Sequence, residues 1–185
     1  MMSFTKKITP VNDFILSSNK HTKMTPLPRS PTKIIIITPN EMLMTGIKCV
    51  LKDNESINII RTNTAISNSL FYWRHQEEED FPHVILVDTQ QRRISCYEFI
   101  IRFKNLNDKT KILVMGDQFR HEKLQEYFDA GADGYLDQAA STSTFVQAIN
   151  TVVHDGKKFL FTPLLPFHGH IVLEPFEEEV QEKQA

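Results

Sequence analysis

Short apolar runs alternate with helix-period segments from Lys33 to about residue 163, and this alternation restricts the possible folds more than any other feature. The apolar runs are IIII at 34–37, INII at 57–60, HVILVD at 83–88, KILVMG at 111–116 and GYL at 134–136. Such a pattern is typical of repeated βα units that build a parallel sheet buried on both faces. The sequence therefore predicts an α/β domain with five strands.

The segments between these runs place their apolar residues on one helical face. Leu43, Ile47 and Leu51 show the spacing most clearly. Helices are predicted over 42–52, 64–76, 97–104, 120–130 and 141–154. The last helix should end at Asp155-Gly156, a C-cap signal, and be followed by a short extended piece, KKFLFTP. The domain is thus expected to span residues 33–163.

The two ends of the chain differ from this domain in composition. Residues 1–32 are rich in Ser, Thr, Lys and Pro and contain one acid, Asp13, which predicts a disordered arm. An organellar transit peptide has a similar composition, although it usually contains more arginine. Residues 164–185 form a C-terminal extension, predicted to be a docking strand followed by an acidic tail with five Glu and one Lys.

The bulk composition indicates one soluble domain. A chain of 185 residues with 41% hydrophobic residues is long enough for one core, and its net charge of −2 gives no general attraction to nucleic acid or an anionic membrane. No apolar run is long enough to span a membrane, so a membrane partner is not expected. Cys49 and Cys96 lack metal or CxxC spacing, which predicts two core thiols in a reducing cytoplasm.

Three motifs carry a resemblance to a known family: AGADGYL at 130–136, MLMTGIKCVL at 42–51 and VILVD at 84–88. Together they resemble a bacterial response-regulator receiver domain of the NarL-type subfamily, over residues 33–162. The resemblance implies a flavodoxin-like (βα)5 fold, a doubly wound parallel sheet with strand order 2-1-3-4-5. NarL-type relatives carry a C-terminal helix-turn-helix, and the 22 residues after Pro163 are too few for that DNA-binding domain.

The family transfers a phosphoryl group onto an aspartate at the carboxyl edge of the sheet. The reaction needs a divalent cation between carboxylates, a hydroxyl group and a lysine. By resemblance, Asp88 stands at the phospho-acceptor position. The family's acidic pair, hydroxyl and lysine are replaced by Thr38 and Pro39, Gly116, and Gln138, respectively.

These replacements predict an inactive site. With Asp88 the single acid expected in the pocket, no magnesium site, other metal site or cofactor is predicted, and the domain should be a poor phospho-acceptor. We therefore expect a pseudo-receiver and not an enzyme. Asp88 alternatively caps the neighbouring turn or pairs with Arg92 or Arg93, which replace the family's usual turn at this loop. Those arginines can also bind an anion or an acidic partner surface.

Tyr135 matches the family's aromatic switch position, although a half-buried strand end also favours an aromatic residue. The preferred hypothesis is a phosphorylation-independent regulatory module that binds a protein partner or forms a homodimer. The resemblance places the partner surface within residues 120–154. One rival hypothesis is phosphorylation of Asp88 by a dedicated kinase. Another is a small-molecule sensor that uses the pocket near Thr38, Gly116 and Gln138.

Two further motifs receive weaker functional readings. The three consecutive aromatics of FYWR at 71–74 cannot all face the core. Exposed Trp or Tyr there would favour a protein interface, and burial of Phe71 with incidental exposure of the others is the alternative. His168 and His170 lack a third ligand at zinc spacing, so no zinc site is predicted there.

Overall fold

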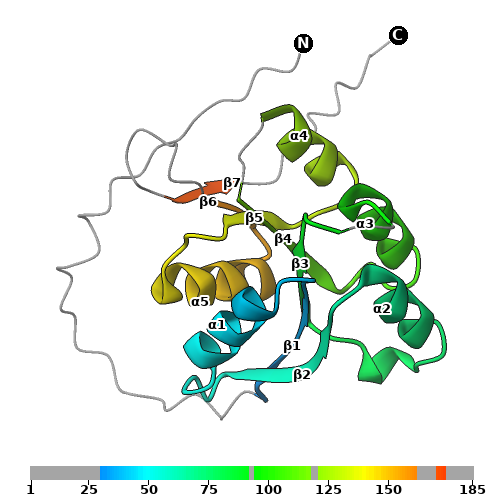
Figure 1. Ribbon diagram of the computed structural model, residues 1–185, viewed down its shortest axis with the longest axis horizontal. Helices are drawn as coiled ribbons and strands as arrows, with labels where there is room; N and C mark the ends of the chain where they lie inside the picture. Colours follow the sequence, from blue (N-terminus) through cyan, green and yellow to red (C-terminus); the bar gives the residue numbers. More distant parts are fainter. Residues whose placement is uncertain (1–29, 92–93, 118–120, 162–169, 174–185) are drawn as a thin grey trace, which may run out of the picture.

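A computed structural model describes residues 30–91, 94–117, 121–161 and 170–173. Its centre is one seven-stranded sheet in the order β2-β1-β3-β4-β5-β6-β7 (Figure 1). The strands are β1 (Thr32–Ile37), β2 (Ile57–Asn63), β3 (Val84–Asp88), β4 (Lys111–Gly116), β5 (Gly134–Asp137), β6 (Lys158–Phe161) and β7 (His170–Leu173). The flavodoxin-like fold and the order 2-1-3-4-5 of the first five strands are confirmed.

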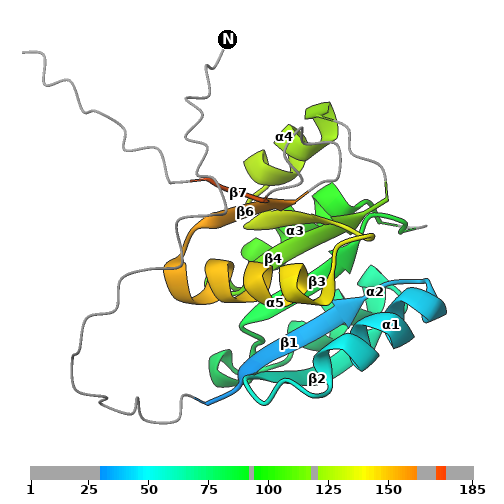
Figure 2. The same ribbon diagram turned by 90° about the vertical axis from the view of Figure 1, so that its left-hand side faces the viewer.

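Five α-helices cover the two faces of this sheet. They are α1 (Glu41–Leu51), α2 (Ile66–Trp73), α3 (Cys96–Lys104), α4 (His121–Asp129) and α5 (Thr142–Asn150). Helices α1 and α5 lie on one face, and α2, α3 and α4 on the other (Figures 1 and 2). Helix α5 continues into a π-helical turn, η3 (Thr151–Asp155), so the predicted helix over 141–154 is interrupted near its end.

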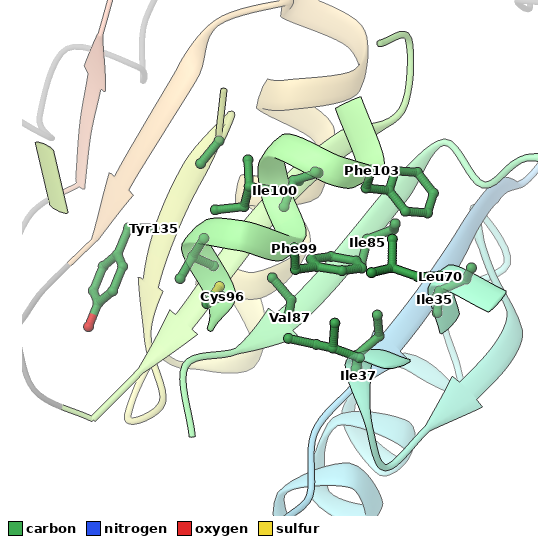
Figure 3. Packing of buried hydrophobic residues seen from close by; sticks show 14 of the residues in the cluster. Ile35, Ile37, Leu70, Ile85, Val87, Cys96, Phe99, Ile100, Phe103 and Tyr135 are labelled. Carbon is green, nitrogen blue, oxygen red and sulfur yellow. The ribbon is translucent and has the colours of Figure 1, made fainter. Parts of the chain in front are cut away.

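The four isoleucines of β1 explain why both faces are covered. All four have 0% exposure, because Ile35 and Ile37 pack under α2 and α3 while Ile34 and Ile36 pack under α1 and α5. Figure 3 shows the first of these clusters, in which Phe99 of α3 lies against the sheet. A strand buried on both sides needs an unbroken apolar run. For this reason the four isoleucines were sufficient to predict the strand from the sequence.

Two strands extend the sheet beyond β5. Strand β6 pairs with β5 in parallel, with Gly134 opposite Phe159, and lies in the piece predicted to be extended. Strand β7 pairs with β6 in antiparallel orientation, within the region where a docking strand was predicted. As a result β5 is an internal strand, and its outer edge is occupied by the chain itself.

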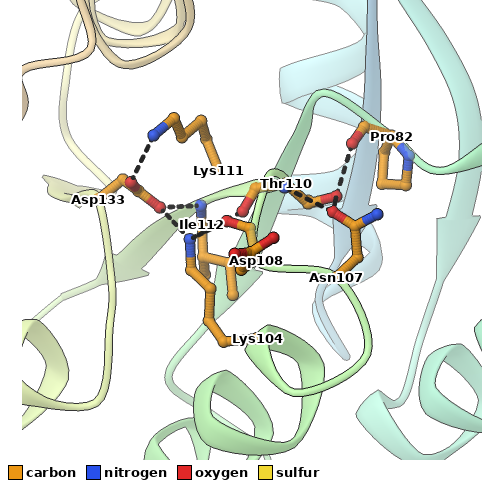
Figure 4. A network of polar contacts seen from close by, with 8 residues as sticks. All are labelled: Pro82, Lys104, Asn107, Asp108, Thr110, Lys111, Ile112 and Asp133. Atoms are coloured by element: carbon orange, nitrogen blue, oxygen red, sulfur yellow. Dashed lines mark hydrogen bonds and ion pairs between the residues drawn. The ribbon is translucent and has the colours of Figure 1, made fainter. Parts of the chain in front are cut away.

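The AGADGYL motif ties β4 and β5 together at the amino edge of the sheet. The carboxylate of Asp133 accepts hydrogen bonds from Lys104 Nζ at 2.9 Å, Lys111 Nζ at 3.2 Å and the backbone N–H of Ile112 at 2.9 Å (Figure 4). Gly131 has φ of 104°, in the region that favours glycine, and its Cα faces the side chain of Lys104. The motif therefore has a structural role in this chain.

The burial predicted for Cys49 was wrong; the prediction that the FYWR aromatics cannot all face the core is confirmed, and the alternative in which Phe71 is buried is wrong. Cys49 is exposed, because the buried stripe of α1 is Met44, Ile47 and Leu51 and residue 49 lies outside it; Cys96 is buried as predicted. In the FYWR segment Trp73 is 2% exposed and Phe71 is 73% exposed, since Ile66, Leu70 and Trp73 form the buried stripe of α2. Within the described part of the chain, no helix combines the length and apolarity needed to cross a bilayer.

Candidate functional site

Asp88 is the last residue of β3, a central strand, and its side chain has 0% exposure. Its Oδ2 accepts a hydrogen bond from Thr38 Oγ1 at 2.5 Å. Its Oδ1 accepts bonds from the backbone N–H of Gln90 at 2.9 Å and from Gln138 Nε2 at 3.2 Å. Three neutral donors thus surround the carboxylate.

The topology of the sheet brings these donors together. Thr38 follows β1 and Gln138 follows β5, and the carboxyl ends of parallel strands meet at one edge. Backbone bonds hold both residues at that edge: Thr38 N donates to Asn63 O at 3.0 Å, and Gln138 N donates to Gly116 O at 2.9 Å. Two of the predicted site residues, Thr38 and Gln138, therefore contact Asp88 directly.

No cation lies against this carboxylate in the described ranges. Among those residues, no lysine or arginine forms an ion pair with Asp88, and no group of three His, Cys, Asp or Glu side chains is placed to hold a metal ion. Arg92 and Arg93 lie outside the described residues, so their pairing with Asp88 stays a prediction. The bond from Gln90 N is the turn cap that the sequence offered as an alternative role for Asp88.

A second contact closes the loop over Asp88. Gln90 Nε2 donates to Asp117 Oδ2 at 2.9 Å, and Thr89 N donates to Met115 O at 2.8 Å. These bonds join the loop after β3 to the end of β4 and the loop beyond it, so they help to exclude water from the carboxylate. Sequence reasoning missed Gln90 and Asp117, although the position of Gln90 two residues after an aspartate is a signal for such a turn.

Gly116 makes room for Tyr135. A Cβ added to Gly116 would lie 2.5 Å from the Tyr135 hydroxyl and 3.2 Å from two ring carbons. Tyr135 is only 3% exposed, and burial first, then the negative charge of Asp137, raises the pKa of its phenol well above the ordinary value. The phenol therefore stays neutral, and its ring occupies the space that a serine or threonine at position 116 would need (Figure 3 labels Tyr135).

Cys96 lies near the same edge but has no nucleophilic character. Burial, and secondarily the negative charge of Asp88, raises the pKa of its thiol far above the ordinary range. A thiol that remains protonated is a weak nucleophile. Cys96 therefore acts as a core residue beneath α3.

Pro39 lies at a different part of the carboxyl edge of the sheet, where it lines a cavity. A cavity of about 160 Å³ lies there, on the side of α2, and not at the position between Thr38, Gly116 and Gln138 where a pocket was predicted. It is lined by Pro39, Thr64, Ala65, Ile66, Ser67, Gln91 and Ile94. The four predicted pocket residues thus lie in three different places. Thr38 and Gln138 are hydrogen-bonded to Asp88, Gly116 packs against Tyr135, and Pro39 lines this cavity.

The fold is similar to solved receiver domains. A two-component response regulator of the LuxR family from Aurantimonas sp. SI85-9A1 superposes with a TM-score of 0.64 and 16% identity, over 72% of this chain and 91% of that one. The receiver domain of the putative response regulator NarL from Mycobacterium tuberculosis gives 0.62 and 14%, over 68% and 98%. The CheX–CheY–BeF3–Mg complex from Borrelia burgdorferi gives 0.60 and 10%, over 66% and 89%.

Neither a protein-family model nor a curated protein sequence matches this chain. The structural likeness nevertheless covers about two thirds to three quarters of the chain and most of each receiver domain. The fold of this chain is therefore that of response-regulator receiver domains. At these identities the likeness establishes the fold alone.

Proposed function

We propose that this protein is a pseudo-receiver: a regulatory module in two-component-type signalling that acts through protein contact and without phosphorylation. The observation that carries the proposal is the environment of Asp88. Its carboxylate is completely buried and accepts bonds from Thr38, Gln90 and Gln138, all neutral donors. In this proposal the protein is not an enzyme.

The chemistry of phosphoryl transfer supports this reading. The transferred group carries negative charge on its equatorial oxygens, so catalysis depends on cations that neutralise it. Magnesium needs several oxygen ligands, usually carboxylates, water and phosphate. Asp88 offers one carboxylate, and Thr38 and Gln138 already occupy its oxygens. A donor that stabilises such charge typically lowers the barrier by about 3–4 kcal/mol, and here several are replaced at once.

The same reasoning implies a constitutive conformation. A ligand or modification shifts a two-state protein only through its different interaction with the two states. A site that cannot gain a phosphoryl charge supplies no such difference. Tyr135, buried against Gly116, is therefore proposed to keep one rotamer in the working protein.

A protein partner is the proposed target of this conformation. In the CheX–CheY complex a receiver domain is seen with another protein, and a comparable contact is proposed for this chain. A homodimer, a cytoplasmic location and the absence of direct DNA binding belong to the same proposal. Because β6 pairs along the outer edge of β5, the exposed sides of α4 and α5 are the parts of residues 120–154 left for a partner.

Incubation with magnesium and a small phosphodonor, followed by intact mass measurement, tests the proposal. We expect no stoichiometric mass gain, while a receiver domain with a complete acidic site, run in parallel, should gain one phosphoryl group. A stoichiometric gain that disappears in Asp88→Asn would instead support phosphorylation of Asp88. Repeating the assay with a histidine kinase and its phosphotransfer partner extends the test to donors that supply charge in trans.

A further inference from the structure

The contact between α2 and the sheet contains buried polar atoms without hydrogen bonds. Four side-chain atoms in this region are sealed from solvent and lack a partner within the described residues: Asn63 Nδ2, Ser69 Oγ, Trp73 Nε1 and Gln91 Nε2. Ser69 is 0% exposed and Trp73 2% exposed. Buried polar groups almost always find a partner, so a group of four around one short helix requires an explanation.

Two of these atoms lie on facing surfaces of β2 and α2. In the strand register Ile37 pairs with Asn63 and Ile35 with Arg61, and both isoleucines face α2, so Asn63 and Arg61 face the same way. The Arg61 guanidinium lies 3.8 Å over the ring of Tyr72, which marks the side of α2 that meets β2. Ser69 is one helical turn before Tyr72 and lies on that side.

The beginning of α2 is also weakly held. Helices α1, α3 and α5 have N-cap residues whose side chains each accept a hydrogen bond from a backbone N–H: Asn40, Ser95 and Ser141. The corresponding residue of α2 is Ala65, which offers no side-chain acceptor. Its first amide, Ile66 N, reaches Gln91 Oε1 at 3.3 Å, and the cavity of about 160 Å³ lies beside it.

One apolar stripe attaches α2 to the sheet. Ile66, Leu70 and Trp73 are buried in the cluster that includes Ile35 and Ile85. Figure 3 labels Leu70 beside these two isoleucines. When the helix is docked, no protein donor or acceptor among the described residues pairs with these four polar atoms. When it is open, they regain water at the cost of exposing the apolar stripe. The docked state is therefore less favoured than the apolar contacts alone imply.

We propose that α2 is a displaceable helix, which opens from β1 and β2 as a unit more readily than α3 or α5. The inference rests on the contacts beneath α2 and is independent of the state of Asp88. In this proposal the part of the protein that changes conformation is α2, which lies at the β2 edge of the sheet. Partner binding that stabilises either position of α2 would shift the population of the two.

Native-state hydrogen exchange on the full chain tests the proposal directly. We expect the hydrogen-bonded amides of α2 to exchange at least about tenfold faster than those of α3 and α5, through a local opening. The rate should change little at low denaturant concentration, because a local opening exposes little surface. If α2 amides exchange only with the global unfolding of the domain, the proposal is wrong.

Ser69→Ala identifies the cause of the opening. Removing the unpartnered hydroxyl should slow α2 exchange about tenfold relative to Ser67→Ala, which lies in the same helix and changes helix propensity equally. Faster exchange in Ser69→Ala would mean that a bound water satisfies the hydroxyl and stabilises the docked helix. Equal effects of the two alanines would mean that the hydroxyl carries no penalty. Either result would overturn the proposal.

Discussion

Asp88 and Asp133 lie at opposite edges of the same sheet and are held by different kinds of partner. Asp133, at the amino edge, has a side chain 16% exposed and is bound by the ammonium groups of Lys104 and Lys111 (Figure 4). Asp88, at the carboxyl edge, is fully buried and bound by a hydroxyl, an amide and a backbone N–H. In the part of the chain that the structure describes, ammonium groups pair with the carboxylate that joins β4 and β5, and none pairs with Asp88.

The difference separates a carboxylate that is paired with positive charge from one that neutral donors hold among the described residues. Lysine ammonium groups are point charges that stabilise any anion placed beside them. Neutral donors satisfy the lone pairs of one carboxylate and leave no net charge for a second anion. The two aspartates therefore have the same side chain but differ in whether positive charge surrounds the carboxylate. This comparison can be tested by changing each aspartate in the same way.

The largest effect is expected from Asp133→Asn. The substitution removes the charge that pairs with Lys104 and Lys111, both partly buried, and should lower the free energy of unfolding by about 3 kcal/mol. Asp88→Asn should cost less than about 1 kcal/mol, because the amide oxygen can keep the Gln90 bond and the amide nitrogen can donate to Thr38 Oγ1. Urea unfolding measures both values.

Asp129→Asn, at an exposed position in α4, is the control for charge removal and should change stability by no more than about 0.5 kcal/mol. A larger loss in Asp88→Asn than in Asp133→Asn would break the comparison. It would mean that the negative charge of Asp88 stabilises the fold and has a partner of its own.

Thr38→Val tests the hydrogen bonds at Asp88 from the donor side. Valine keeps the shape but removes the hydroxyl that donates to Asp88 Oδ2 and accepts from Asn40 N. A fully buried carboxylate oxygen then lacks its donor, which should cost about 2 kcal/mol in urea unfolding. Thr45→Val, at an exposed position in α1, is the matched control and should be nearly neutral. The loss should shrink in the Asp88→Asn background; equal losses in both would contradict the assigned bond.

Gly116→Ala tests why a glycine ends β4. The new methyl group would lie 2.5 Å from the Tyr135 hydroxyl, so the ring must move toward solvent, at a cost of about 1–2 kcal/mol. Nitration by tetranitromethane, located by peptide mapping, should leave Tyr135 unmodified in the parent chain and modify it in the variant. Gly46→Ala, where nothing lies within 4 Å of the added carbon, is the control. A Tyr135 that stays protected in a variant of unchanged stability would refute this role of Gly116.

The fold was predictable because its strands are buried on both faces. Each of the first five strands is an apolar run, and their order followed from the resemblance carried by AGADGYL and VILVD. Strands β6 and β7 have four residues each; β6 was predicted only as a short extended piece, and β7 lies within the residues predicted to form a docking strand. The wrong burial of Cys49, and the alternative that buried Phe71, came from weighing residue type above helical spacing, although the spacing of the buried neighbours places both correctly.

The site was predictable only in part, for a related reason. Thr38 and Gln138 end or follow strands, and parallel strands bring such positions to one edge. The bond between Gln90 and Asp117, and the contact between Gly116 and Tyr135, depend on loop conformation and side-chain rotamers. No spacing rule in the sequence predicts these two contacts. From the sequence, Gly116 could therefore be interpreted only as the loss of a hydroxyl side chain, and not as a residue that makes room for the Tyr135 ring.

The smallest expected effect on stability comes from His83, which lies just before β3 at the amino edge of the sheet. Its Nδ1 accepts a bond from Lys33 N at 2.9 Å, and burial, then the charges of Lys33 and His154, lower its pKa. Because the folded-state pKa lies below the unfolded value of about 6.5, the unfolded chain binds the proton first. This contribution to stability is complete above about pH 6.5 and is lost as the pH falls toward the folded-state pKa. In His83→Asn, which keeps an acceptor for Lys33 N, urea midpoints should fall less between pH 7.5 and 5.5 than in the parent chain. An unchanged pH dependence would show that His83 titrates alike in both states.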